Sequence, residues 1–70
     1  MDSVVKRRII ESVTKHEGRV KKIHSTKTRR DAIDKVHNFV VAENQIQKAH
    51  MSRDDLYDVE YTIRKEVSFS

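Results

Sequence analysis

Turn-forming residues are almost missing from this chain, which has no proline and a single glycine in 70 residues. Proline and glycine supply many of the turns in proteins, because one fixes the backbone and the other reaches conformations that most residues avoid. A chain with so few of them has few places to change direction. We therefore expect a small number of long elements in one domain, residues 1–70.

The composition of the chain limits the core that it can build. Apolar residues make up 36% of the sequence and charged residues 37%. A chain of 70 residues is also close to the lower limit at which a domain buries enough surface to fold alone. We expect a thin core that gains stability from a second copy or from a partner.

Several classes of protein are disfavoured by what the sequence lacks. It contains no cysteine, which excludes a disulfide scaffold, a thiolate zinc site and a cysteine nucleophile. The longest uninterrupted apolar run is residues 39–42, far too short to cross a membrane or to form a signal-peptide core. We expect a cytoplasmic protein that does not interact with membranes.

A first helix is predicted over residues 3–24. Residues on one helical face recur there at steps of 4, 4, 3, 4 and 3: Val5, Ile9, Val13, His16, Val20 and Ile23. Asp2 or Ser3 is suited to cap its start. Gly18 follows cationic residues as it would at a helix end, so two alternatives stay open. The helix either continues through Gly18, straight or kinked, or stops just before it and leaves residues 19–25 as a strand or an extended connector.

A second helix is predicted over residues 28–50. Thr26 or Thr28 is suited to cap its start, and Asp31 places a negative charge in the first turn. One face at helical spacing holds Ala32, Ile33, Val36, Phe39, Val40, Ile46 and His50. We expect this helix to form the centre of the core.

The C-terminal segment, residues 57–69, alternates between apolar and polar side chains. Its odd positions hold Tyr57, Val59, Tyr61, Ile63, Lys65, Val67 and Phe69. This pattern predicts a strand with one buried face. A helix is the alternative, since Ser52 with Asp55 resembles a capping box. Its narrower stripe would be Leu56, Val59, Ile63 and Val67. That stripe leaves the aromatic residues out, so the strand is favoured.

The expected fold class is therefore α+β and mainly helical: two helices over 3–24 and 28–50, followed by a strand over 57–69. The alternative is an all-α three-helix domain. A lone strand cannot satisfy its backbone groups, so it must pair with residues 19–25 or with a second copy. We expect a homodimer formed by the second helix and the strand. The dimerisation residues on the strand would be Tyr57, Val59, Tyr61, Ile63 and Val67.

Charge is sorted between the two halves of the chain. Residues 1–30 contain ten Lys or Arg and three acids, whereas residues 31–70 contain five and eight, for a net charge of +4. Like charges crowded together repel unless an anionic partner relieves them. The sorting favours a polyanion as the partner.

The basic half predicts a nucleic-acid surface. On a helix over 3–24, four cations at steps of 7, 4 and 3 would form one stripe about 21 Å long. These are Arg8, Lys15, Arg19 and Lys22, with further cations at Lys6, Arg7, Lys21, Lys27, Arg29 and Arg30. Free N–H groups at the start of the second helix would add to the attraction for phosphates. The expected function is a small regulatory or accessory protein that binds DNA or RNA without sequence preference.

A protein-binding modulator, such as an inhibitor, an antitoxin-like factor or an adaptor, is the alternative function. Its basic stripe would contact an acidic protein surface, and its strand would add to the edge of a partner's sheet. Tyr57 and Tyr61 suit base stacking in principle. They share their predicted strand face with Val59 and Ile63, however, so we expect them in the core.

No catalytic or metal site is predicted. The histidines are His16, His24, His37 and His50. No two of them have the i,i+4 spacing that would place two ligands together on a helix. An acidic cluster holds Asp54, Asp55, Asp58 and Glu60. We expect it to be a solvated surface, or a docking face for the basic stripe of another copy. No Ser/His/Asp arrangement can be assembled, so we expect neither an enzyme nor a cofactor.

Overall fold

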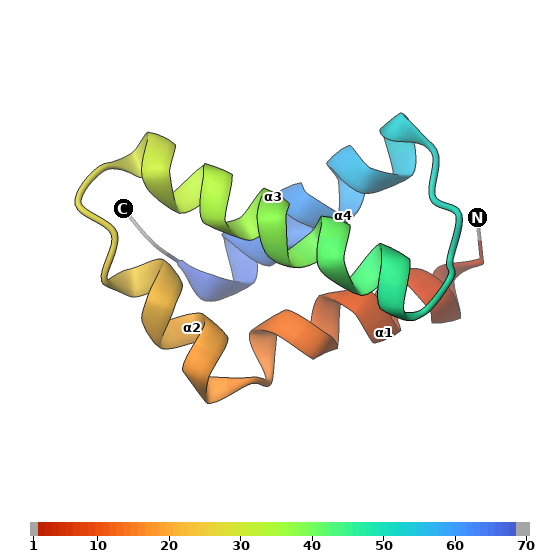
Figure 1. The fold of residues 1–70 in the computed structure, drawn as a ribbon, viewed down its shortest axis with the longest axis horizontal. Coiled ribbons are helices and arrows are strands. Elements are labelled where there is room, and N and C mark those ends of the chain that lie inside the picture. Colours follow the sequence, from red (N-terminus) through yellow and green to blue (C-terminus); the bar gives the residue numbers. More distant parts are fainter. Residues whose placement is uncertain (1, 69–70) are drawn as a thin grey trace.

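The computed structural model describes residues 2–68 and contains four α-helices there, with no strand in that range. They are α1 (Ser3–Thr14), α2 (Glu17–His24), α3 (Arg29–Ile46) and α4 (Arg53–Val67) (Figure 1). The expected α+β class is therefore wrong. The all-α alternative fits, with four helices in place of three.

The segment predicted as a strand over 57–69 forms most of α4. The Ser52 hydroxyl caps this helix by accepting a hydrogen bond from the Asp55 N–H at 3.2 Å, as the capping-box alternative predicted. Val59, Ile63 and Val67 are buried four residues apart. A step of four is also a multiple of two, so the same residues satisfy the alternation of a strand. Residue 69 of the predicted strand lies outside the described residues.

The first predicted helix is interrupted, but not at Gly18. Its start is capped by Asp2, whose carboxylate accepts a hydrogen bond from the Val4 N–H at 2.9 Å. The helix ends at Thr14 and resumes at Glu17, because the backbone of His16 is extended. Gly18 lies inside α2, and residues 19–24 are helical. The kinked alternative therefore describes this segment better than a strand or connector over 19–25.

The second predicted helix is confirmed as α3, but it ends at Ile46 rather than at residue 50. Thr28 caps its start by accepting from the Asp31 N–H at 3.1 Å. At its end, the N–H groups of Lys48 and Ala49 bond back to the carbonyls of residues 45 and 44, which is a Schellman motif. Lys48 occupies the left-handed conformation (φ 51°) that glycine usually adopts there. Ile46, predicted to lie on the core face, is 69% exposed.

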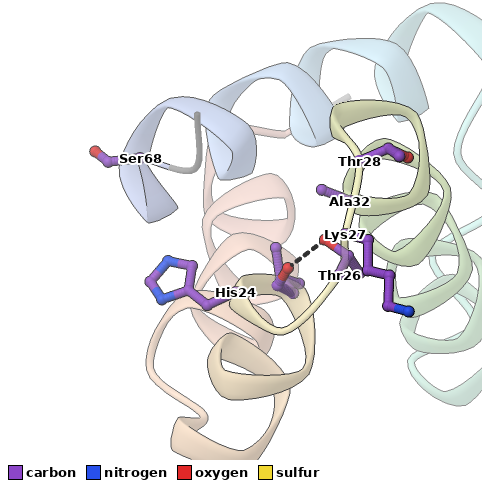
Figure 2. Close-up of a pocket in the computed structure, with 7 residues that line it drawn as sticks. His24, Thr26, Lys27, Thr28, Ala32 and Ser68 are labelled. Atoms are coloured by element: carbon purple, nitrogen blue, oxygen red, sulfur yellow. Dashed lines mark hydrogen bonds between the residues drawn. The ribbon is translucent and has the colours of Figure 1, made fainter.

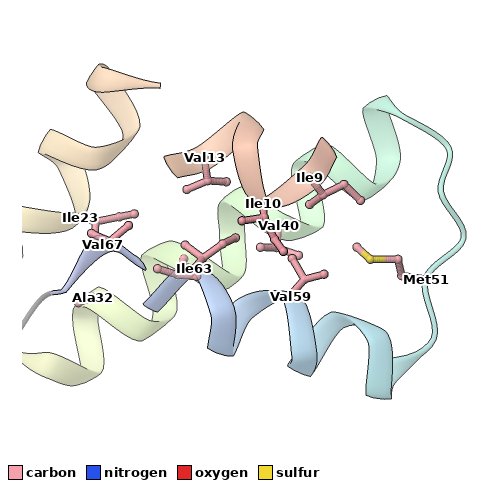
Figure 3. Packing of buried hydrophobic residues seen from close by; sticks show 11 residues of the cluster. Ile9, Ile10, Val13, Ile23, Ala32, Val40, Met51, Val59, Ile63 and Val67 are labelled. Atoms are coloured by element: carbon pink, nitrogen blue, oxygen red, sulfur yellow. The ribbon is translucent and has the colours of Figure 1, made fainter. Parts of the chain in front are cut away.

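The core is one cluster to which all four helices contribute (Figure 3). Its buried side chains are Ile9, Ile10, Val13, Ile23, Ala32, Val36, Val40, Met51, Val59, Ile63 and Val67. α1, α3 and α4 supply most of them, while α2 supplies only Ile23. Within the described range, none of the helices has both the length and the apolar character needed to cross a membrane.

Candidate nucleic-acid interface

Two cations of the basic half hold α1 against α4. The Lys6 ammonium lies 2.8 Å from the Asp58 carboxylate and 3.3 Å from that of Asp55. The Arg7 guanidinium lies 2.9 Å from Glu66. Hydrogen bonds to Asp58 and then to Asp55 raise the pKa of Lys6 above its ordinary value. These two cations, both expected to contact nucleic acid, are engaged within the chain.

Arg19 is the third cation with an internal partner, although the sequence places it in the phosphate-binding stripe. Its guanidinium donates to the Glu43 carboxylate at 2.7 Å and to the Ser12 carbonyl at 3.2 Å. In an unbroken helix that carbonyl would accept from His16, but the His16 N–H bonds to Val13 instead. Arg19 therefore caps the end of α1 at the break, and it also lies 5.1 Å from the centre of the Phe39 ring.

Glu43 is the buried acid that forms an ion pair with Arg19. Partial burial alone would raise its pKa, but hydrogen bonds from Gln47 and Arg19 outweigh this effect and hold the pKa below its ordinary value of 4.5. Glu43 is therefore an anion at neutral pH. The network fixes the position of α2 against α3 and leaves the Arg19 side chain only 20% exposed.

Six cations of the basic half are exposed, and none lies within 4 Å of a carboxylate in residues 2–68. They are Arg8, Lys15, Lys22, Lys27, Arg29 and Arg30. Lys21 differs because it pairs with Glu17 at 3.2 Å along the exposed face of α2. Such a pair is weak and competes poorly with a phosphate. The predicted single stripe is broken, since Arg8 lies on α1 and Lys22 on α2, with a kink between them.

An open pocket of about 380 Å³ brings one of these free cations to α4. We call it the tyrosine pocket; it is lined by Arg29, Tyr57, Tyr61, Arg64 and Lys65. Among residues 2–68 no acidic side chain lines it, although Asp31 lies in the same first turn of α3 as Arg29. The pocket therefore combines three cations with two aromatic rings.

The two rings of this pocket are held parallel in solvent. Their centres are 6.4 Å apart and their planes differ by 8°. Tyr57 is 66% exposed and Tyr61 is 48% exposed, so the prediction that they lie in the core is wrong. Arg64 and Lys65 lie 5.7 and 5.4 Å from the centre of the Tyr61 ring, within range of a cation–π interaction.

The amino-acid sequence alone does not predict this pocket, because its residues come from two distant parts of the chain. Arg29 is 28 residues before Tyr57, and only the packing of α3 on α4 brings them together. One local signal was present: the tyrosines are four residues apart, and Arg64 and Lys65 follow Tyr61 by three and four. On a helix these spacings place the four side chains on one face.

A second hollow, of about 280 Å³, lies beside the loop between α2 and α3 (Figure 2). His24, Lys27 and Ser68 are among its polar lining residues. The Lys27 ammonium and the Ser68 hydroxyl point away from one another in Figure 2, so they do not converge on a common ligand. The His24 Nε2 lies 3.0 Å from the Val67 carbonyl, which ties α2 to the end of α4. We therefore interpret this hollow as a junction between helices and not as a ligand site.

The acidic cluster acts within the chain. Asp55 and Asp58 contact Lys6, and Glu60 lies 2.9 Å from the Nδ1 of His37. Across residues 2–68, no group of three or more His, Cys, Asp or Glu side chains could hold a metal ion. Asp55, Asp58 and Glu60 therefore join helices, which differs from the expected solvated surface, whereas Asp54 is exposed in the first turn of α4.

The predicted dimerisation residues are divided by the fold. Val59, Ile63 and Val67 are buried in the chain's own core, whereas Tyr57 and Tyr61 are exposed. The strand that was expected to pair with a second copy is absent from the described residues. A dimer built on that strand is therefore withdrawn.

Comparison of this chain with protein-family models, with curated proteins and with solved structures finds no match. The function is therefore inferred from the residues and contacts described above. Those contacts divide the cations into a group that joins helices and a group that faces solvent.

Proposed function

We propose that this protein binds nucleic acid through contacts between its unpaired cations and the phosphates. The observation that carries the proposal is the division of the basic half: Lys6, Arg7 and Arg19 join helices, while six other cations face solvent without an acid partner among the described residues. Crowded unpaired cations repel one another, and a polyanion relieves that repulsion. Nucleic acid is the polyanion whose regular phosphates suit several separate cations at once.

The free cations are concentrated where α3 begins. Lys27, Arg29 and Arg30 lie within four residues there, at a helix start where Thr28 caps the Asp31 N–H and the other N–H groups of the first turn have no acceptor within the helix. Those groups and the helix dipole also favour a phosphate. In Figure 1, α4 runs from the α3–α4 connection back toward this end of the molecule, and it adds Arg64 and Lys65. Five cations therefore surround one end of the α3–α4 pair.

The other function considered, a modulator that binds an acidic protein surface, loses part of its basis. Its strand was expected to extend a partner's sheet, and the described residues contain no strand. Its basic surface remains, so the two functions are separated by the chemistry of the ligand. The experiment must therefore measure binding to nucleic acid and show whether that binding depends on phosphate contacts.

The test is the affinity of the chain for labelled duplex DNA, single-stranded DNA and RNA across a salt series. Release of counterions makes affinity fall steeply with salt, by about 10²-fold between 50 and 200 mM for a protein making about four phosphate contacts. We expect this behaviour here. If the folded chain binds none of the three at low salt, the proposal is wrong and an acidic protein surface becomes the better partner.

Two variants with matched charge locate the contacts. One carries Lys27→Gln, Arg29→Gln and Arg30→Gln; the other carries Arg8→Gln, Lys15→Gln and Lys22→Gln. Each variant loses three positive charges, so a difference between them reports position and not net charge. We expect the first to bind more weakly and to show the shallower salt dependence. Equal losses would mean that the cations act only through net charge.

A further inference from the structure

The tyrosine pocket has features that bear on which form of nucleic acid the protein binds. Its two rings are among the few large hydrophobic side chains that the described residues leave exposed, and Val4 and Ile46 are the others. A chain with a thin core gains nothing in folding by leaving two tyrosines in water. Their exposure, parallel stacking and cationic surroundings together indicate a ligand with flat apolar faces and negative charge.

The geometry presents the rings as a platform. Tyr57 and Tyr61 are one helical turn apart on α4, so their side chains are held by the same rigid element. Arg64 and Lys65 lie near the Tyr61 ring and belong to the last turn of the helix. A base that stacks on a ring here would have its phosphates within reach of these cations and of Arg29. Stacking of bases on aromatic side chains beside a cationic groove is how proteins bind single strands without reading sequence.

We propose that the tyrosine pocket binds unpaired nucleobases, so that the protein prefers single-stranded nucleic acid over a duplex. The inference rests on the proposed function, because it takes phosphate binding as given and adds the bases. Bases inside a duplex stack on one another and cannot offer their faces to a protein side chain. An acidic peptide would satisfy the cations but would leave the ring faces without a matching partner.

The tyrosines themselves provide the first test. The chain has two tyrosines and no tryptophan, so its intrinsic emission comes from Tyr57 and Tyr61 alone. The probes are a thymidine oligonucleotide of about eight nucleotides and an abasic strand of equal length, which has the same phosphates without the bases. We expect the thymidine strand to quench the emission and the abasic strand to leave it unchanged. Equal effects of the two strands would overturn the inference.

Variants of the rings provide the second test, read by anisotropy of labelled strands. Tyr57→Leu with Tyr61→Leu keeps apolar side chains at both positions but removes the rings, whereas Tyr57→Phe with Tyr61→Phe keeps them. Loss of one stacked base costs about tenfold or more in affinity. We therefore expect the leucine variant to lose at least tenfold for the single strand and little for the duplex, and the phenylalanine variant to bind like the original chain.

The outcomes separate this inference from the proposed function. If single strands bind with a steep salt dependence but neither quench the tyrosines nor respond to the leucine variant, the inference is wrong while phosphate binding stands. If no nucleic acid binds at low salt, both are wrong. Circular dichroism of each variant checks the fold, which two exposed positions should leave intact.

Discussion

Arg19 joins three parts of the molecule with one planar group. It donates to the carbonyl that α1 leaves free at its end, pairs with Glu43 of α3 and lies against the Phe39 ring. The sequence places it in a row of cations at helical spacing and gives no sign that it is different. Its partners are 7 and 24 residues away, so the distinction depends on the packing of α2.

Replacement of Arg19 by lysine should destabilise the fold although it keeps the charge. An ammonium cannot present two fixed N–H donors to the Ser12 carbonyl and the Glu43 carboxylate in the way a guanidinium does. A part-buried partner left unsatisfied costs about 1–3 kcal/mol. The measurement is urea unfolding, with Lys22→Ala as an exposed control expected to change stability by less than about 0.5 kcal/mol. Equal effects of the two substitutions would contradict the role given to Arg19.

Glu43 should make the stability of the fold depend on acid pH. Its pKa is held below the ordinary 4.5, so the folded state keeps this carboxylate charged more strongly than the unfolded state does. The resulting stability is fully present above pH 4.5 and is lost as pH falls through the lower folded-state pKa. Urea unfolding over this range should show a shallower decline for Glu43→Gln than for the original chain. Parallel curves would mean that the carboxylate is not coupled to folding.

At the scale of elements, the capped helix starts were the most predictable features. Asp2 and Thr28 were each one of two candidates for their cap, and the Ser52 and Asp55 pair was read as a capping box. α4 was wrongly predicted as a strand because its buried residues lie four apart, a step shared by a helix face and a strand face. The two tyrosines made the sequence pattern favour the strand, because the pattern does not show that they are exposed on α4.

Substitutions in α4 distinguish directly between a strand and a helix over these residues. On a strand, Tyr61 and Ile63 would share one buried face, whereas on α4 Ile63 is fully buried and Tyr61 is 48% exposed. We expect Ile63→Ala to cost about 2–5 kcal/mol, because it leaves a cavity in the core. Tyr61→Ala should cost less than about 1 kcal/mol by the same urea measurement. Similar costs at both positions would contradict the helix.

The end of α3 offers a stabilising substitution. Lys48 adopts a left-handed backbone (φ 51°) at the position of the Schellman motif where glycine is usual. Glycine there relieves the strain of the side chain, although it adds entropy to the unfolded chain. We expect Lys48→Gly to raise the free energy of unfolding by up to about 1 kcal/mol. A loss of stability would show that the lysine side chain contributes contacts at this turn.

At the scale of the whole molecule, the sorting of charge has two consequences that the sequence could not separate. Lys6 and Arg7 meet acids 52 and 59 residues away, so part of the basic half neutralises part of the acidic half across the α1–α4 contact. Arg19 and Lys21 pair with Glu43 and Glu17, and the six other cations of the basic half face solvent without an acid partner in residues 2–68. The sorting of charge along the sequence predicted an anionic partner, but which cations are free depends on these long-range pairs.

We propose that nucleic acid binds where α3 begins and α4 ends. The most direct test is a titration of the ¹⁵N-labelled chain with a short thymidine oligonucleotide, following the backbone amide signals by NMR. We predict that the largest shifts fall at residues 27–30 and 57–65, and that the amides of α1 change little. Shifts centred on Arg8 and Lys15 would place the binding surface on α1 instead, and an absence of shifts at low salt would mean that the chain does not bind this strand.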